Sequence, residues 1–134
     1  TDIGGTNSVR VFRTSGDVTT TSTSPVDFTG ATATITTGAN PVFVGFQGAC
    51  SNNDTAQRFQ YNVDVDGTDE TFGEINQHAT AESMQCSYGH LTPALTAAAH
   101  TIKQQWLVSA GTGTTFCNSA ANGSCTYVVF EVVD

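Results

Sequence analysis

Basic residues are almost absent from this chain. Its 134 residues contain one lysine and three arginines against twelve acidic residues, which gives a formal net charge of −8 at pH 7. Nucleic-acid binding needs clustered Lys and Arg that neutralise phosphates. Adhesion to an anionic membrane surface needs the same clusters. The composition therefore excludes nucleic acid and anionic lipid as expected partners.

Long hydrophobic runs are also missing. No apolar segment approaches the roughly 20 residues of a membrane-spanning helix, so we expect no membrane insertion, and no basic-then-apolar leader is present. Leucine occurs only three times, whereas Thr, Val and Phe, which suit a pleated and half-buried strand, are frequent. The chain lacks an initiating Met, so we expect a processed product or a portion of a longer protein. The composition predicts an all-β fold.

Catalytic motifs are absent as well. The sequence contains no G-x-S-x-G elbow and no H-E-x-x-H pair. His78, His90 and His100 are irregularly spaced, which is typical of surface or hydrogen-bonded histidines. We therefore predict that the chain is not an enzyme and has no catalytic residues and no cofactor.

Four cysteines lack the spacing of a metal site. Cys50, Cys86, Cys117 and Cys125 show neither C-x-x-C clustering nor a nearby His, which zinc sites usually need. An even count in a small domain favours disulfides and an oxidising or extracellular setting. Three pairings are open. We favour Cys117–Cys125, which would close the loop of residues 118–124, and this leaves Cys50–Cys86.

Short alternating segments dominate the rest of the chain. The clearest is residues 58–65, where Phe59, Tyr61, Val63 and Val65 alternate with polar residues and predict a half-buried strand. The other expected strands are residues 9–13, 25–28, 31–36, 42–48, 71–75, 84–88, 100–108 and 126–134. Eight to ten short strands with this turn spacing predict a sandwich or barrel.

Turn signals and low-complexity sequence divide these segments. Turns are expected at residues 29–30 and 38–41, at Asp66-Gly67 and at residues 111–113. Residues 91–95 form a connection containing Pro93, and residues 94–99 have only a weak helical tendency. The Thr- and Ser-rich residues 19–24 favour an N-terminal arm or linker with one short strand over residues 1–24. The β-sandwich domain is then residues 25–134.

The closing segment, residues 126–134, is apolar on both of its faces. Tyr127, Val129 and Val133 fall on one face, and Val128, Phe130 and Val132 fall on the other. Such a strand is central in a sandwich, with its outer face against a second sheet or another subunit. The predicted oligomer interface consists of Tyr127, Val128, Val129, Phe130 and Val132.

The order of these patterns resembles a known family. The segments that carry the likeness are residues 26–28 with 31–36, 41–46 (PVFVGF), 61–67 (YNVDVDG), 95–106 (LTAAAHTIKQQW) and 128–132 (VVFEV). They resemble the jelly-roll head domains of phage structural proteins, meaning fibre tips and capsid decoration (cement) proteins, which look like the C1q and tumour-necrosis-factor trimers. The likeness covers roughly residues 20–134, and the four cysteines depart from its pattern.

This resemblance implies a non-enzymatic structural protein of the virion surface or the extracellular space. It implies a homotrimer with the closing strand near the threefold axis, and neighbouring capsid or fibre proteins as further partners. An alternative is an extracellular filament subunit. In that case residues 1–24, which include the alternating residues 9–13, would complete a neighbour's sheet as a donor strand.

Two weaker ligand signals remain. Asp64, Asp66, Asp69 and Glu70 are weak calcium candidates, but their spacing is not that of an EF-hand, and we favour a polar hairpin turn as their explanation. Tyr88 is the candidate exposed ring of a sugar site, which would make the chain a carbohydrate-binding module or lectin-like domain with surface glycans as partners.

Two short motifs match the N-glycosylation sequon. They are Asn-Asp-Thr at residues 53–55 and Asn-Gly-Ser at residues 122–124. Both fall in predicted loops.

Overall fold

A computed structural model describes residues 4–13, 16–55, 57–77, 80, 82–117 and 125–133. Over these residues the chain forms twelve β-strands and no helix. The strands are β1 (Gly4–Arg13), β2 (Val18–Thr20), β3 (Val26–Thr36), β4 (Val42–Gln47), β5 (Ala49–Asn52), β6 (Arg58–Val65), β7 (Thr68–Asn76), β8 (Met84–Gln85), β9 (Tyr88–Leu91), β10 (Ala99–Val108), β11 (Gly113–Phe116) and β12 (Cys125–Glu131). No helix that could cross a membrane occurs in this part of the chain.

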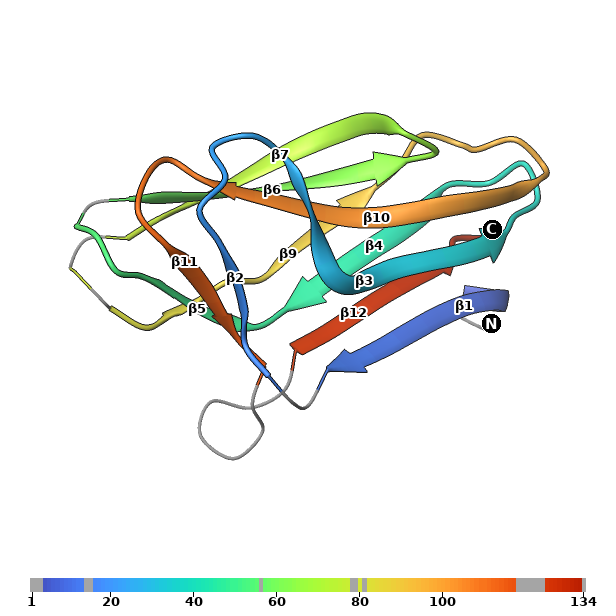
Figure 1. Cartoon of the computed structure of the whole chain (residues 1–134). Coiled ribbons are helices and arrows are strands. Elements are labelled where there is room, and N and C mark those ends of the chain that lie inside the picture. The colour runs from blue at the N-terminus through green and yellow to red at the C-terminus, as the bar shows by residue number, and fades with distance from the viewer. Residues whose placement is uncertain are drawn as a thin grey trace.

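The strands form three antiparallel sheets of four (Figure 1). The β12 sheet has the order β1-β12-β4-β9, and the β10 sheet has the order β3-β10-β6-β7. The end sheet, β2-β11-β5-β8, closes one end of the sandwich. If the strands of the two main sheets are counted along the chain, the first pairs with the eighth and the second with the seventh. This is the pairing of a jelly roll, and it confirms the predicted all-β, antiparallel jelly-roll sandwich.

The core lies between the β12 and β10 sheets and follows the predicted alternation. Phe59, Tyr61 and Val63 of β6 have no exposed surface, and their neighbours on β10 across the pairing are Val108, Trp106 and Gln104. Aromatic rings join the two sheets. Phe28 lies 5.0 Å from Trp106 and 5.2 Å from Phe46, measured between ring centroids, and Phe46 lies 5.8 Å from Tyr61. Burial of these large rings supplies much of the free energy of folding.

Two disulfides cross-link the chain, and their pairing is the one favoured from the sequence. Cys50 of β5 bonds to Cys86, with 5.7 Å between their Cα atoms, and Cys117 bonds to Cys125, with 5.0 Å between theirs. The first bond joins residues 36 positions apart, and the second closes a segment of eight positions. Because cross-links restrict the unfolded chain, each is expected to contribute about 2–4 kcal/mol to the free energy of unfolding.

Three local expectations were wrong. The turn expected at residues 29–30 lies inside β3, where Gly30 has a φ of 85° and the pairing with β10 shifts register between Lys103 and Gln105. Residues 28–31 of β3 bulge out opposite the single residue Gln104. A glycine at positive φ can bend a strand in this way without ending it. Residues 84–88 form parts of two strands, and Leu91 belongs to β9 rather than to the following connection.

The N-terminal segment pairs with the rest of the sandwich. β1 pairs along β12, from Gly4 opposite Glu131 to Arg13 opposite Cys125, and β2 pairs with β11. Residues 1–24 thus contribute two strands to the sheets, where one strand was predicted, and the expected division at residue 24 does not coincide with a break in strand pairing. In this structure β1 occupies the edge of its own chain's sheet, where a donor strand from a neighbour would otherwise bind.

Candidate interaction face

The closing strand β12 lies between β1 and β4, as expected for a central strand. Its alternate residues have different surroundings. Tyr127 and Val129 are 3% and 0% exposed and face the core, where the Tyr127 hydroxyl donates a hydrogen bond to the Ile102 carbonyl at 3.2 Å. The even-numbered residues on the outer side are half-buried. Two of the five residues predicted for the interface therefore belong to the chain's own core, and Val128, Phe130 and Val132 are the three that face outward.

An aromatic pair extends this outer side across β4. Phe43 pairs with Phe130, and their ring centroids are 5.1 Å apart. Gly45 and Gly89 make room for the Phe43 ring. A Cβ atom at position 45 would lie 3.0 Å from Phe43 Cε1, and one at position 89 would lie 2.8 Å from Phe43 Cζ. These two glycines let the ring lie along the sheet instead of standing away from it.

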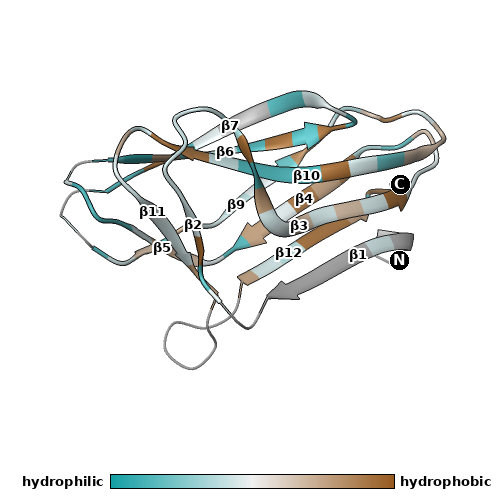
Figure 2. Ribbon diagram, in the orientation of Figure 1, coloured by the Kyte–Doolittle hydropathy of each residue, from teal (hydrophilic) through white to brown (hydrophobic). Residues whose placement is uncertain are grey.

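The outer side continues onto the edge strand β9. Leu91 pairs with Phe43 on the side opposite Phe130, and its side chain is 54% exposed. We call Phe43, Leu91, Val128, Phe130 and Val132 the apolar face. A groove of about 200 Å³ borders it. The groove is lined by Gly45, Phe46, Gln47, Tyr88, Thr126 and Val128. A contiguous apolar patch of this kind is a candidate interaction site. Figure 2 shows brown stretches along β4 and β12, which include apolar residues of both faces of these strands.

The signal for this wider face was present in the sequence. The alternation that places Val42, Val44 and Phe46 on one side of a strand also places Phe43 on the other side. Its partner Leu91 was missed, because Pro93 made the segment resemble a connection rather than a strand edge. The contact between β4 and β9 is non-local, and no short-range pattern reports it.

The outer face of the β10 sheet has the opposite character. Lys103 Nζ lies 2.8 Å from Asp27 Oδ2, and Gln105 donates to Asp27 Oδ1 at 2.9 Å. Asn62 donates in turn to Gln105 at 3.1 Å. Hydrogen bonds from Lys103 and then from Gln105 lower the pKa of the Asp27 carboxyl below its ordinary value. Asp27, Lys103 and Gln105 thus form a hydrogen-bonded polar row on this face, with Asn62 buried beside it.

The acidic cluster lies at the hairpin between β6 and β7. Asp66 and Gly67 have φ values of 53° and 87°, as a two-residue turn of type I′ requires. Asp64 Oδ1 accepts the Gly67 N–H at 3.0 Å, and Asp66 Oδ1 accepts the Thr101 N–H at 2.8 Å. Within the described residues no group of three metal-ligating side chains occurs. Two of the calcium candidates thus bind backbone N–H groups of their own fold, and the hairpin interpretation is favoured; Asp69 and Glu70 lie beyond the turn on β7.

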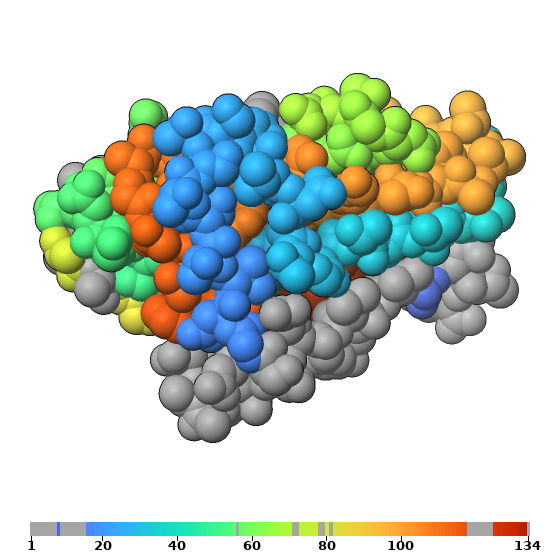
Figure 3. Space-filling view, in the orientation of Figure 1, coloured from blue at the N-terminus to red at the C-terminus, as the bar shows by residue number. Residues whose placement is uncertain are grey.

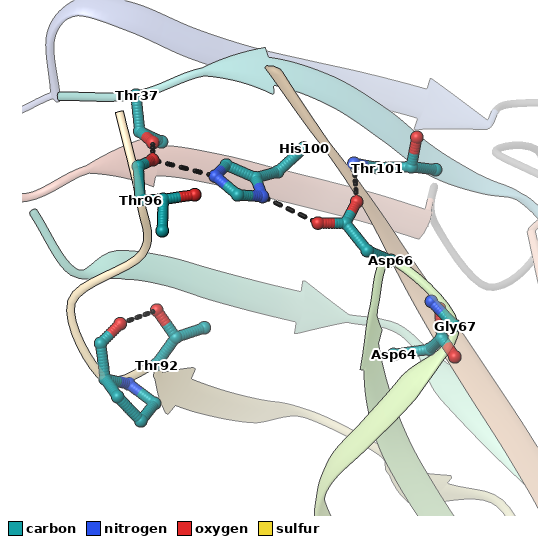
Figure 4. A network of polar contacts seen from close by, with 9 residues as sticks. Thr37, Asp64, Asp66, Gly67, Thr92, Thr96, His100 and Thr101 are labelled. Atoms are coloured by element: carbon teal, nitrogen blue, oxygen red, sulfur yellow. Dashed lines mark hydrogen bonds and ion pairs between the residues drawn. The ribbon is translucent and has the colours of Figure 1, made fainter. Parts of the chain in front are cut away.

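His100 joins this hairpin to two further loops (Figure 4). Its Nδ1 lies 2.7 Å from Asp66 Oδ2, and its Nε2 lies 2.9 Å from the Thr96 carbonyl oxygen. The same carbonyl accepts a hydrogen bond from the Thr37 hydroxyl at 2.9 Å. Both partners of the imidazole are acceptors, so both ring nitrogens are satisfied only when the ring is protonated.

The electrostatics of this His100 network follow from that geometry. The hydrogen bond to Thr96 and then the one to Asp66 raise the pKa of His100 above its ordinary value. The hydrogen bonds from His100 and from the Thr101 N–H lower the pKa of Asp66. The charged pair therefore ties together the ends of β3, β6 and β10. The expectation of surface or hydrogen-bonded histidines is confirmed at His100 but not at His90, whose Nε2 is buried without a hydrogen-bond partner among the described residues. His78 lies outside those residues.

Tyr88 does not have the setting of an exposed sugar platform. Its ring stacks on Tyr61 with 5.6 Å between centroids, and its hydroxyl lies 3.5 Å from the Asn62 carbonyl oxygen. Burial raises the pKa of the Tyr88 hydroxyl well above its ordinary value. Tyr88 pairs with Phe46 and so faces inward from β9. In the sequence, the neighbouring Gly89 suggests that Tyr88 lies on an exposed turn. In the structure, Gly89 instead makes room for the Phe43 ring on the other side of the sheet.

Solved structures share this fold. No protein-family model and no curated relative matches the sequence. The infectious bursal disease virus VP2 subviral particle matches with a TM-score of 0.54 and 14% identity over 97% of this chain and 38% of that one. The Gt strain of the same virus gives 0.54 and 13% over 98% and 39%. Eiger TNF from S. frugiperda gives 0.55 and 7% over 96% and 94%.

These matches define the class of fold. The chain spans less than two fifths of the length of the VP2 chain, but it corresponds to nearly all of the Eiger chain. The molecule is therefore a jelly-roll domain whose fold occurs both in viral particle proteins and in a TNF-like protein. Identities of 7–14% carry the fold and no further property.

Proposed function

We propose that this chain is a non-enzymatic structural domain of a virion surface, a capsid decoration (cement) protein or fibre head, which assembles as a homotrimer through the apolar face. The observation that carries the proposal is the face itself. Its five residues bear no charge, and they lie on a molecule with a net charge of −8. Identical copies repel one another wherever their acidic surfaces meet, so an uncharged face is where they can associate.

The fold and the cysteines support the same function. Jelly rolls of viral particle proteins and of Eiger TNF have comparable architecture. All four cysteines are bonded, as suits a virion or extracellular location. In the assembly, neighbouring capsid or fibre proteins would contact surfaces outside the threefold interface. A cement protein and a fibre head need the same trimer and differ in what these outer surfaces touch.

The test is the solution mass of the unreduced protein, measured by light scattering across a range of concentrations. We expect three times the chain mass of 14.0 kDa. A specific interface of standard size buries about 1,600 Å² in total, and the dependence of the mass on concentration measures how tightly the copies associate. A monomer at all concentrations would overturn the trimer, and capsid-binding assays would then have to be made with the monomer.

A further inference from the structure

The sequon of residues 53–55 lies on the loop that follows β5. Asn53, Asp54 and Thr55 are all exposed. Figure 3 shows this part of the chain in green at the left end of the molecule, where it meets solvent. We propose that Asn53 is the acceptor of an N-linked glycan when the chain matures in a compartment that glycosylates proteins. This proposal does not depend on the proposed function.

The Asn53 side chain is oriented for this modification. Its Oδ1 accepts the Thr112 N–H at 2.8 Å, and its own backbone N–H donates to the Thr112 carbonyl at 3.1 Å. The amide oxygen therefore faces the neighbouring loop before β11. Since Oδ1 and Nδ2 branch from the same planar carbon, the nitrogen is directed away from Thr112. Nδ2 is the atom that carries an N-linked sugar.

The chemistry leaves the observed hydrogen bond intact. A lipid-linked diphospho-oligosaccharide supplies the sugar. The bond between its C1 and the diphosphate oxygen breaks, a bond from C1 to Asn53 Nδ2 forms, and the lipid diphosphate departs while Nδ2 releases one proton. Oδ1 remains an acceptor throughout, so the bond from Thr112 N–H is retained. The glycosylated chain can thus keep the loop conformation that this hydrogen bond holds.

Buried side chains hold the loop in this position from below. Gln77 Oε1 accepts the Asn52 N–H at 2.6 Å, and Gln77 Nε2 donates to the carbonyls of Asn52 and Asp54 at 2.8 and 3.1 Å. The Asn52 amide nitrogen donates to the Ala110 carbonyl at 2.9 Å. Asn52 and Gln77 are almost fully buried, so the exposed sequon sits on a rigid support and stays available after folding.

The site is also compatible with the disulfides and with the apolar face. Disulfides form in the same oxidising compartments of the secretory pathway in which N-glycans are added. The apolar face lies on β4, β9 and β12, whereas Asn53 follows β5 of the end sheet. In Figure 1 this loop lies at the left end and the C-terminus lies at the right. A glycan at Asn53 would shield that end and leave the apolar face open.

The experiment is secretion of the full chain from a eukaryotic host, followed by glycosidase release and mass spectrometry of the peptide that contains Asn53. We expect glycan at Asn53 in most molecules, detected as conversion of Asn53 to Asp on release. Thr55→Ala should abolish it without changing Asn53, and Thr55→Ser should retain it. Asn122→Gln, which removes the other sequon in a segment outside the described residues, should leave Asn53 occupied.

The outcome that would overturn the proposal is an unmodified Asn53 in secreted protein with both disulfides formed, while a reporter glycoprotein from the same host is modified. The melting temperature and disulfide content of each variant check that it is folded. Loss of glycan in Thr55→Ala together with loss of secretion would not count as support. In that case the Thr55→Ala result is set aside, and the proposal is judged on two other variants. The glycan should be retained in Thr55→Ser and lost in Asn53→Asp.

Discussion

The two main sheets have the same number of strands and matching inner faces, yet their outer faces differ. Phe43 and Phe130 pack against each other with tilted rings on the outside of the β12 sheet, whereas Asp27, Lys103 and Gln105 form a hydrogen-bonded row on the outside of the β10 sheet. The fold explains neither choice, because a jelly roll needs apolar residues only on the faces that form its core. The polar row can exchange hydrogen bonds with water. The apolar face offers water no such groups, and this difference is the main support for the proposed assembly.

The largest expected effect comes from placing a charge on the apolar face. Leu91→Asp should convert the proposed trimer to monomer, because a buried and unpaired carboxylate at an interface costs several kcal/mol. Leu91 is more than half exposed in the single chain, so folding itself should be little affected. Light scattering and the melting temperature measure the two effects separately.

The matched control is Thr34→Asp, which places the same charge on an exposed position of β3 in the β10 sheet. It should leave the mass unchanged. If both variants remain trimeric, the apolar face is not the interface. If both become monomeric, general charge repulsion rather than the apolar face controls assembly.

The second prediction tests whether Gly89 is needed to make room for the Phe43 ring. Gly89→Ala should destabilise the chain by about 1–3 kcal/mol, because the new Cβ would lie 2.8 Å from Phe43 Cζ and force the ring to move. Gly73→Ala in β7 of the β10 sheet is the comparison, since its Cβ would lie 4.0 Å from its nearest neighbour, Tyr88 Cβ. That change should be neutral or stabilising by up to about 1 kcal/mol. Urea denaturation of both variants measures the difference, and equal effects would show that the Phe43 ring is free to shift.

The comparison of the two outer faces also shows which features of the fold could be predicted from the sequence. Period-two alternation correctly placed Phe59, Tyr61 and Val63 in the core, and cysteine spacing led to the observed disulfides. For residues 127–132 the same alternation established that both faces are apolar, but it could not tell which one the chain covers itself. That depends on pairing between β12, β1 and β4, which are far apart in sequence. The groups around Phe43 became evident only when β9 was placed beside β4.

Turn-forming residues were a less reliable guide to the strand boundaries than the alternation of apolar and polar residues. The sequence predicts a turn at Gly30, and the observed φ of 85° agrees with the ability of glycine to adopt positive φ. The strand nevertheless continues through it, because β10 supplies hydrogen bonds on both sides of the bulge. The His100 network was similarly invisible: Asp66, Thr96 and His100 come from separate segments, and only the closed sandwich brings them within hydrogen-bonding distance.

The smallest expected effect is the pH dependence of stability, which should involve the His100 network and not the apolar face. The pKa of His100 is raised on folding, so its contribution to stability is complete below the pKa of about 6.5 in the unfolded chain. That contribution is lost as the pH rises through the higher folded value. The pKa of Asp66 is lowered, so its contribution is present above about pH 3.8 and is lost only when the pH falls through its folded value. The His100 network is therefore strongest in mildly acidic solution.

His100→Gln should lower the free energy of unfolding by about 1 kcal/mol at pH 5.5 and by less at pH 8.5, since a neutral amide cannot replace a charge-assisted hydrogen bond. Urea denaturation at the two pH values measures this change. The trimer mass should stay constant over the same range, because none of the five residues of the apolar face titrates. If the mass in solution changed with pH while the free energy of unfolding did not, a titrating group would lie at the interface. That result would contradict the assignment of the interface to the apolar face. Equal destabilisation by His100→Gln at both pH values would show that His100 acts through packing rather than through its charge.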